Sequence, residues 1–215
     1  SKTHVATMSH CDFVDDEKSI TIDKPIQYRV VYTDDKGKET ELKSPAPLLE
    51  GELIDTSILC FDVLTEFLEE QVQDAKDKEV LFSIHLKATM MKVSDPIIFG
   101  EAVRVYFKDL FVKYGPLFNE IGVNVNNGFA QLLSKIQQLP EAKRQEIEAD
   151  IQKIYAKNPP LAMVNSDKGI TNLHVPSDVI VDASMPAMIR DGGQMWGPDG
   201  QLHDTKAVIP DSSYA

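Results

Sequence analysis

The sequence predicts an α/β fold in which helices flank a mixed sheet and an antiparallel β-hairpin forms a flap near the N-terminus. Three observations predict it. Residues 19–22 and 27–32 alternate apolar and polar side chains, as half-buried strands do. Residues 80–86 form a continuous apolar run, which is typical of a strand covered on both faces. Amphipathic helical patterns occupy much of the remaining chain.

The flap is predicted from its turn chemistry. Residues 33–38, Thr-Asp-Asp-Lys-Gly-Lys, are a turn-rich tip, and residues 39–42 provide the returning strand. Pro45 and Pro47 follow this strand. Because proline cannot donate a hydrogen bond to a strand ladder, we expect the strand to end before them.

Four amphipathic helices are predicted after the flap. Residues 55–76 repeat apolar side chains at three- and four-residue spacing behind Asp55, which suits an N-cap. A Ser-Asp-Pro start signal opens the second helix, over residues 96–113. Two more cover residues 124–138 and 140–156. The apolar face of the second helix comprises Val103, Tyr106, Phe107, Leu110 and Phe111.

Short strands and one apolar helix are predicted in the C-terminal part. Residues 161–164 and 207–209 have the apolar character of short buried strands. Residues 176–190 carry few charges, so we expect a buried helix that Pro186 kinks or interrupts. The Gly-rich loop 191–200 follows a helix rather than a strand, which favours turns over a phosphate cradle.

Charge and cysteine content restrict the function classes. The chain has 34 acidic and 22 basic residues, for a formal charge of −12. We therefore expect no nucleic-acid partner and no membrane partner, because such a chain repels phosphates and anionic lipid. No stretch approaches the roughly 18 apolar residues of a membrane span. Two cysteines are too few for a disulfide scaffold, so a cytoplasmic location is expected.

The length of 215 residues predicts one domain or a part-domain of a longer chain. Residues 1–50 would be the β-rich flap, and residues 51–215 the α/β portion that carries the site residues. The chain has no initiator methionine, and residues 209–215 stop abruptly. We therefore expect a fragment of a larger protein.

Histidine and cysteine give a weak metal signal. His4, His10, Cys11 and Asp12 lie close together in the sequence. A zinc site needs ligands from more than this one stretch, so a polar loop is the favoured interpretation. Cys60 falls on the apolar face of a predicted helix, where cysteine acts as a small hydrophobe.

Lys87 is the first candidate site residue. It is the first charge after the apolar run, at the carboxyl end of a predicted strand. Open α/β sheets bind ligands at that edge. A lysine partly desolvated there can take part in proton transfer. The alternative is a strand-end lysine whose ammonium reaches water along its aliphatic stem.

Asp182 is the second candidate. It lies four residues after Asp178, within an otherwise apolar segment, so both acids would share one helical face. Asp178 suits the positive N-terminus of the predicted helix, whereas Asp182 has no such explanation. A buried carboxylate is usually paired or bound to a cation. Two interpretations carry equal weight: an ion pair with Arg190 or a lysine, and a ligand for a hard metal ion.

Several long runs point to one family. They are residues 85–100 (His-Leu-Lys-Ala-Thr-Met-Met-Lys-Val-Ser-Asp-Pro-Ile-Ile-Phe-Gly), 161–190, 195–200 and 207–215. These runs resemble the monomeric type of NADP-dependent isocitrate dehydrogenase, and their length makes the resemblance far more specific than a short motif. Residues 10–18, His-Cys-Asp-Phe-Val-Asp-Asp-Glu-Lys, depart from the family pattern at several positions, so no site residue is assigned there.

The resemblance implies an isocitrate/isopropylmalate dehydrogenase-like fold and a monomeric parent enzyme. That enzyme oxidises isocitrate with NADP and decarboxylates it to 2-oxoglutarate, using Mg²⁺ or Mn²⁺. This chain would be the first part of its large inserted domain, inactive alone. Lys87 is implied as the catalytic and substrate-binding lysine, and Asp182 as a metal ligand. The remainder of the parent polypeptide would supply most of the NADP site, the arginines that hold the substrate carboxylates, a tyrosine and two further aspartates.

These two roles carry a geometric expectation. One substrate hydroxyl must contact Lys87 and also the metal that Asp182 binds. The two side-chain tips should therefore face one cleft at the carboxyl edge of the sheet, within roughly 5–10 Å of each other. The alternative function class is a noncatalytic α/β binding or interaction module.

Overall fold

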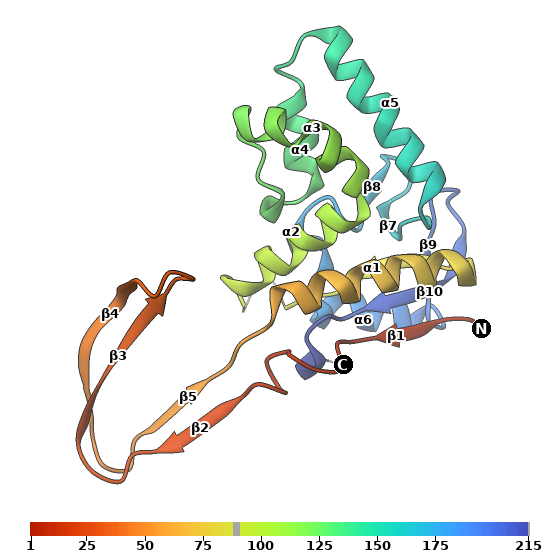
Figure 1. Cartoon of the computed structure of the whole chain (residues 1–215). Coiled ribbons are helices and arrows are strands. Elements are labelled where there is room, and N and C mark those ends of the chain that lie inside the picture. The colour runs from red at the N-terminus through yellow and green to blue at the C-terminus, as the bar shows by residue number, and fades with distance from the viewer. Residues whose placement is uncertain (88–90, 215) are drawn as a thin grey trace.

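The computed structural model describes residues 1–87 and 91–214. Its central sheet has the strand order β1–β10–β6, and all three strands are parallel. Strand β9 adds to β10 in the antiparallel sense, so the sheet is mixed, as predicted. The sheet joins segments from both ends of the sequence (Figure 1). The bounds are β1 His4–Ala6, β6 Leu81–Ile84, β9 Gln194–Trp196 and β10 Leu202–Val208.

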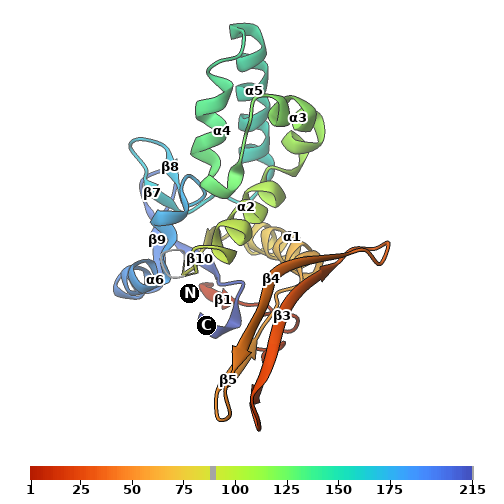
Figure 2. The ribbon, with the colours of Figure 1, turned by 90° about the vertical axis from the view of Figure 1, so that its left-hand side faces the viewer.

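Helices flank this sheet, which confirms the α/β prediction. Helix α1 (Phe61–Lys78) and helix α6 (Val181–Arg190) lie on opposite sides of it (Figure 2). Helix α2 (Ser94–Tyr106) packs on α1 and connects to a second group of helices farther from the sheet. This group consists of α3 Lys108–Glu120, α4 Phe129–Ile136 and α5 Glu141–Lys157. All four residues of β6 are buried, as its apolar run predicted.

Short elements connect these parts. Strands β7 and β8 pair with each other as a small antiparallel ribbon. Three single-turn 3-10 helices precede α4, precede α6 and follow β10. In chain order these elements are η1 Val125–Asn127, β7 Met163–Asn165, β8 Ile170–Thr171, η2 Pro176–Val179 and η3 Ser212–Tyr214. Among the described residues, no helix is both long enough and apolar enough to cross a bilayer.

The flap projects away from the helices and the central sheet (Figure 1). Strands β3 and β4 pair in the antiparallel sense around the tip, which confirms the predicted hairpin. Strand β2 does not join this hairpin but pairs with β5, where the chain returns. The four strands are β2 Lys18–Thr21, β3 Ile26–Thr33, β4 Glu39–Leu48 and β5 Leu53–Thr56.

Two predicted boundaries in this region were wrong. Strand β4 continues through Pro45 and Pro47, because a strand in a two-stranded ribbon has a free edge where a missing donor costs little. Helix α1 begins at Phe61 rather than at Asp55. Asp55 lies in β5, opposite Ser19 of β2, so pairing within the flap outweighs its N-cap preference.

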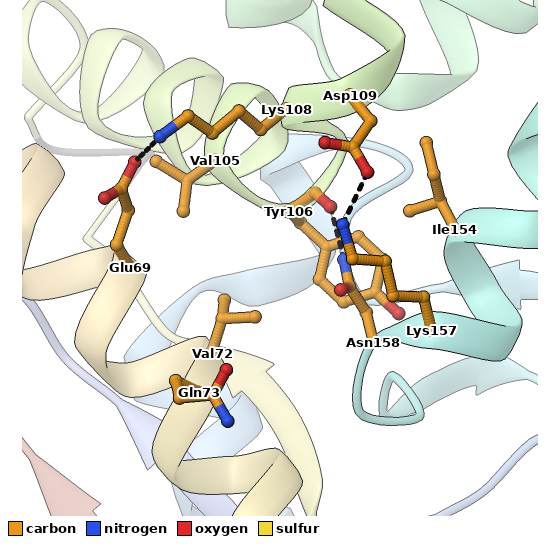
Figure 3. Close-up of a pocket in the computed structure, with 10 residues that line it drawn as sticks. All are labelled: Glu69, Val72, Gln73, Val105, Tyr106, Lys108, Asp109, Ile154, Lys157 and Asn158. Atoms are coloured by element: carbon orange, nitrogen blue, oxygen red, sulfur yellow. Dashed lines mark hydrogen bonds and ion pairs between the residues drawn. The ribbon is translucent and has the colours of Figure 1, made fainter.

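The predicted helix over residues 96–113 is two helices, α2 and α3, that meet at Phe107. The backbone of Phe107 leaves the helical region, with φ −102° and ψ 30°. The carbonyl of Tyr106 accepts a hydrogen bond from Asn158 Nδ2 at 2.6 Å. Figure 3 shows that the break turns Lys108 toward Glu69 of α1 and Asp109 toward Lys157 of α5, both at 2.6 Å. Helix α1 and the C-terminal end of α5 thus converge on this break.

The C-terminal helices also differ from the expectation. The segment 124–138 begins with η1 and continues as α4. The segment 176–190 divides into η2 and α6, and within α6, described in full, Met188 is the one buried residue. The predicted burial was therefore wrong. Pro186 lies inside α6 without ending it. The residue four positions earlier, Asp182, is exposed, so water can replace the N–H that proline lacks.

Candidate functional site

The carboxyl ends of the three parallel strands meet at one edge of the sheet. Past β6, His85 N donates to Val208 O at 2.9 Å. Past β10, Ile209 N donates to Ala6 O, also at 2.9 Å. Leu86 then pairs with the segment that leads into α6, since Val181 N donates to Leu86 O at 2.6 Å. The residue after Leu86 is therefore held beside the first turn of α6.

Lys87 and Asp182 meet at this edge. The Lys87 ammonium, whose side chain is 19% exposed, forms an ion pair with Asp182 Oδ1 from α6. Their predicted convergence is confirmed, although the residues are 95 positions apart in the sequence. They touch directly, which is closer than the spacing expected with a substrate between them.

The premise that singled out Asp182 was nevertheless wrong. Its side chain is 56% exposed, so it is not a buried carboxylate. Asp178 belongs to η2 rather than to α6, and the two acids do not share one helical face. Of the alternatives considered for Asp182, the pair with a lysine is present, and its partner is Lys87.

Asp95 holds the backbone of Lys87 in place. Lys87 N donates to Asp95 Oδ2 at 2.7 Å, and Asp95 is almost completely buried. Burial raises the pKa of the Asp95 carboxyl to about 6; the bond from Lys87 opposes this shift and the nearby Asp211 carboxylate adds to it. The sequence pattern marked Asp95 only as part of a helix start. Its second role fixes the backbone from which the Lys87 side chain leaves.

His85 ties the strand to α6. Its Nε2 lies 2.8 Å from Ser83 Oγ, and its Nδ1 lies 2.7 Å from Ser184 Oγ. Burial lowers the pKa of His85 to about 4, so the imidazole is neutral at physiological pH. Asn172 holds the end of the same strand, since its side-chain amide accepts from the N–H of Ile84 and donates to the C=O of Ile84.

These supporting residues were missed, yet the sequence contains one signal for them. Ser83, His85 and Lys87 lie at alternate positions, so their side chains leave the strand on the same side. A polar stripe inside an apolar run marks a face that is not simply core. No such pattern identifies Asp95, Asn172 or Ser184, which reach the edge from other segments.

These features define an α/β domain with a lysine–carboxylate pair where open sheets form ligand sites. The family model of monomeric isocitrate dehydrogenase matches residues 1–215. The chain belongs to the monomeric isocitrate dehydrogenase family.

The sequence is similar to that of curated relatives over the whole chain. It is 56% identical over 215 residues to the NADP isocitrate dehydrogenase of Azotobacter vinelandii and 54% identical to NADP isocitrate dehydrogenase 2 of Colwellia maris. The alignment covers all of this chain and 29% of the length of each of these relatives. A crystal structure of Ostreococcus tauri isocitrate dehydrogenase with isocitrate and magnesium(II) superposes with a TM-score of 0.41 at 8% identity, over 92% of this chain and 35% of the other.

Proposed function

We propose that this chain acts as part of a cytoplasmic, monomeric NADP-dependent isocitrate dehydrogenase. The enzyme would oxidise isocitrate with NADP and decarboxylate it to 2-oxoglutarate with Mg²⁺ or Mn²⁺. The ion pair between Lys87 and Asp182 carries this proposal, since it joins a proton-transfer group and a metal-ligand group at a ligand-binding edge. Family membership and the NADP enzymes among the relatives support the reaction.

Asp182 fits a hard divalent cation. Its carboxylate offers oxygen donors, which Mg²⁺ and Mn²⁺ prefer, and its exposure leaves room for further ligands from substrate or protein. A bound cation would lower the pKa of the substrate hydroxyl and stabilise negative charge that develops on the substrate. The chain contributes one carboxylate to such a site, and the remaining ligands would come from other segments of the parent protein.

Lys87 would act on the substrate hydroxyl. Its Nζ lies at the carboxyl edge of the sheet, and its side chain is largely covered by protein. Asp95 holds its backbone, so the ammonium has a fixed origin. The lysine would position the hydroxyl, assist the departure of its proton and place a positive charge beside the developing anion.

The first test concerns the isolated chain. Because the coenzyme site and the arginines for the substrate carboxylates would lie in other segments, we expect the 215 residues alone to reduce no NADP when isocitrate and Mg²⁺ are supplied. Absorbance of NADPH measures this. Turnover above background by the purified chain would contradict it.

The second test concerns Lys87 in the parent enzyme. Lys87→Met removes the ammonium but keeps the bulk of the stem, so kcat should fall by about 10²–10⁴-fold with a smaller change in KM. Lys92→Met is the matched control, since Lys92 is an exposed lysine five positions along the chain. Equal losses in both variants would contradict a role for Lys87.

The third test separates the roles of the two residues. Asp182→Asn keeps the size of the side chain but removes its charge, so the Mg²⁺ or Mn²⁺ concentration for half-maximal activity should rise by at least about tenfold. Lys87→Met should leave that concentration nearly unchanged. If Asp182→Asn lowers kcat without altering the metal requirement, Asp182 is not a ligand.

A further inference from the structure

Two cysteines and an aspartate gather at the base of the flap. The Sγ atoms of Cys11 and Cys60 and a carboxylate oxygen of Asp16 all lie within 4.8 Å of one another. Cys60 Sγ is 4.0 Å from Asp16 Oδ2. All three residues are half-buried. The stretch around Cys11 offered too few zinc ligands by itself, and the fold brings Cys60 to it from a second stretch. Cys60 does not lie on the apolar face of a helix as predicted, because α1 begins one residue later.

The backbone holds this arrangement in place. Cys60 N donates to Cys11 O at 2.9 Å, which joins the two stretches. Cys11 N donates to Asp15 Oδ2 at 3.0 Å. The loop is anchored to the core through buried Asp12, whose carboxylate accepts Asp15 N at 3.0 Å and Ser212 N at 2.8 Å. These main-chain contacts thus hold the two cysteines close together.

We propose that Cys11, Cys60 and Asp16 bind one divalent cation of the zinc class, with a water or another small donor in the fourth position. Tetrahedral zinc holds thiolate sulfur at about 2.3 Å and carboxylate oxygen at about 2.0–2.2 Å, which separates the ligand atoms by roughly 3.5–3.8 Å. The observed atoms need to move by no more than about 1 Å to reach these separations.

Charge and ligand type both favour this ion. The carboxylate of Asp16 lies beside the two thiols, and that of Asp15 accepts a hydrogen bond from the Cys11 backbone, so negative charge gathers at this point. Carboxylates that disfavour a thiolate also attract a cation, and the cation in turn stabilises the thiolate. As the two metal–sulfur bonds form, the two thiol protons leave to solvent. Thiolates select zinc-class ions over Mg²⁺, which prefers oxygen.

The position of the cluster gives the metal a structural consequence. Cys11 precedes the flap strands and Cys60 follows them. The chain enters the flap through β2 and leaves it through β5, side by side (Figure 1). A bound ion would therefore link the chain before β2 to the chain after β5, and so close the whole flap into one loop.

Cobalt tests this site in the reduced parent enzyme. Co²⁺ is added in the presence of excess Mg²⁺, which occupies oxygen sites such as the one proposed at Asp182. We expect one equivalent of Co²⁺ to give the thiolate charge-transfer and intense visible bands of a four-coordinate sulfur site. Zn²⁺ should displace it stoichiometrically, and further Mg²⁺ should not.

Four variants assign the bands to these residues. Cys60→Ser and Asp16→Asn should each weaken Co²⁺ binding by at least about tenfold. Cys11→Gly should do the same while folding at least as well, since Cys11 has φ +55°, a conformation that favours glycine. Asp35→Asn, at the exposed tip of the flap, is the control and should bind as the unaltered enzyme does.

Three results would overturn the proposal. One is the absence of thiolate bands in the reduced enzyme. Another is Co²⁺ binding that keeps its affinity in folded Cys11→Gly protein. The third is mass spectrometry that finds Cys11 and Cys60 joined as a disulfide, followed by a lack of metal uptake once that bond is reduced.

Discussion

The central sheet and the flap were both predicted from strand patterns, a continuous apolar run in one and alternation in the other, and they differ in burial. Every residue of β6 is buried. No residue of the four flap strands, all of which the structure describes, is buried, and apolar side chains such as Tyr32 and Leu42 are exposed. A two-stranded ribbon is marginal in water without a surface to cover it. The difference shows that alternation predicts a strand but does not say what the strand packs against.

Substitution of two glycines with positive φ, one near the core and one in the flap, should give the largest difference between these regions. Gly128 precedes α4 with φ +98°, and a Cβ there would lie 1.9 Å from the backbone oxygen of His174. That oxygen accepts Ala130 N at 3.0 Å in the first turn of α4. Gly128→Ala should therefore lower the free energy of unfolding by more than about 4 kcal/mol, measured by urea denaturation.

Gly37 at the flap tip is the matched control. It has φ +77°, and a Cβ there would meet nothing within 4 Å. Gly37→Ala should cost about 1 kcal/mol or less, because only backbone strain in an exposed turn is added. Similar losses in the two variants would mean that the flap is as tightly integrated as the core.

Aromatic truncation gives the next largest effect. Phe107 stacks on Phe129 with ring centroids 4.0 Å apart, and both are fully buried. Phe107→Ala should lower the free energy of unfolding by about 3–5 kcal/mol. Tyr32→Ala, an equivalent truncation in the flap, should cost less than about 1 kcal/mol. A larger loss from Tyr32→Ala would show that the flap is a necessary part of the folding unit.

Acid titration sharpens the comparison further, because buried titrating groups lie at the edge of the central sheet. Burial lowers the pKa of His85 to about 4, so the stability that it contributes above its unfolded pKa is lost as pH falls toward 4. Burial raises the pKa of Asp95 to about 6, so its contribution is present at low pH and is lost as pH rises through 6. The two effects oppose each other between pH 4 and 6.

Asp95→Asn removes the titration of residue 95 and leaves that of His85. Relative to the unaltered protein, the variant should gain on the order of 3 kcal/mol of unfolding free energy between about pH 4 and pH 6.5, by urea denaturation at each pH. Asp35→Asn in the flap should track the unaltered protein within about 0.5 kcal/mol. A pH-independent difference between Asp95→Asn and the unaltered protein would refute the raised pKa.

Local patterns predicted the elements of the fold better than their limits. The apolar run of β6, the hairpin and the two helices after residue 124 follow from spacing and turn residues. The break at Phe107 does not, because it depends on Asn158 and Phe129, which approach from later segments. The start of α1 was misplaced for the same reason: residues 53–56 are held as a strand by β2.

The candidate site divides in the same way. Lys87 could be identified because the end of an apolar run lies at a ligand-binding edge. Asp182 was identified for a burial that it does not have, and its actual position depends on the hydrogen bonds that join η2 and α6 to Leu86. This role of Asp95 could not be predicted, because no periodic sequence pattern marks a contact with the backbone of Lys87.

The strand order of the central sheet has a consequence for biosynthesis. His4 of β1 pairs with Lys206 of β10, about 200 residues later, and β10 also separates β1 from β6. At roughly 5–20 residues per second, a ribosome adds β10 about 10–40 s after β1. Until β10 is made, β1 and β6 each lack the strand with which they pair in this sheet. Assembly of this sheet therefore waits for the synthesis of β10, the strand between β1 and β6.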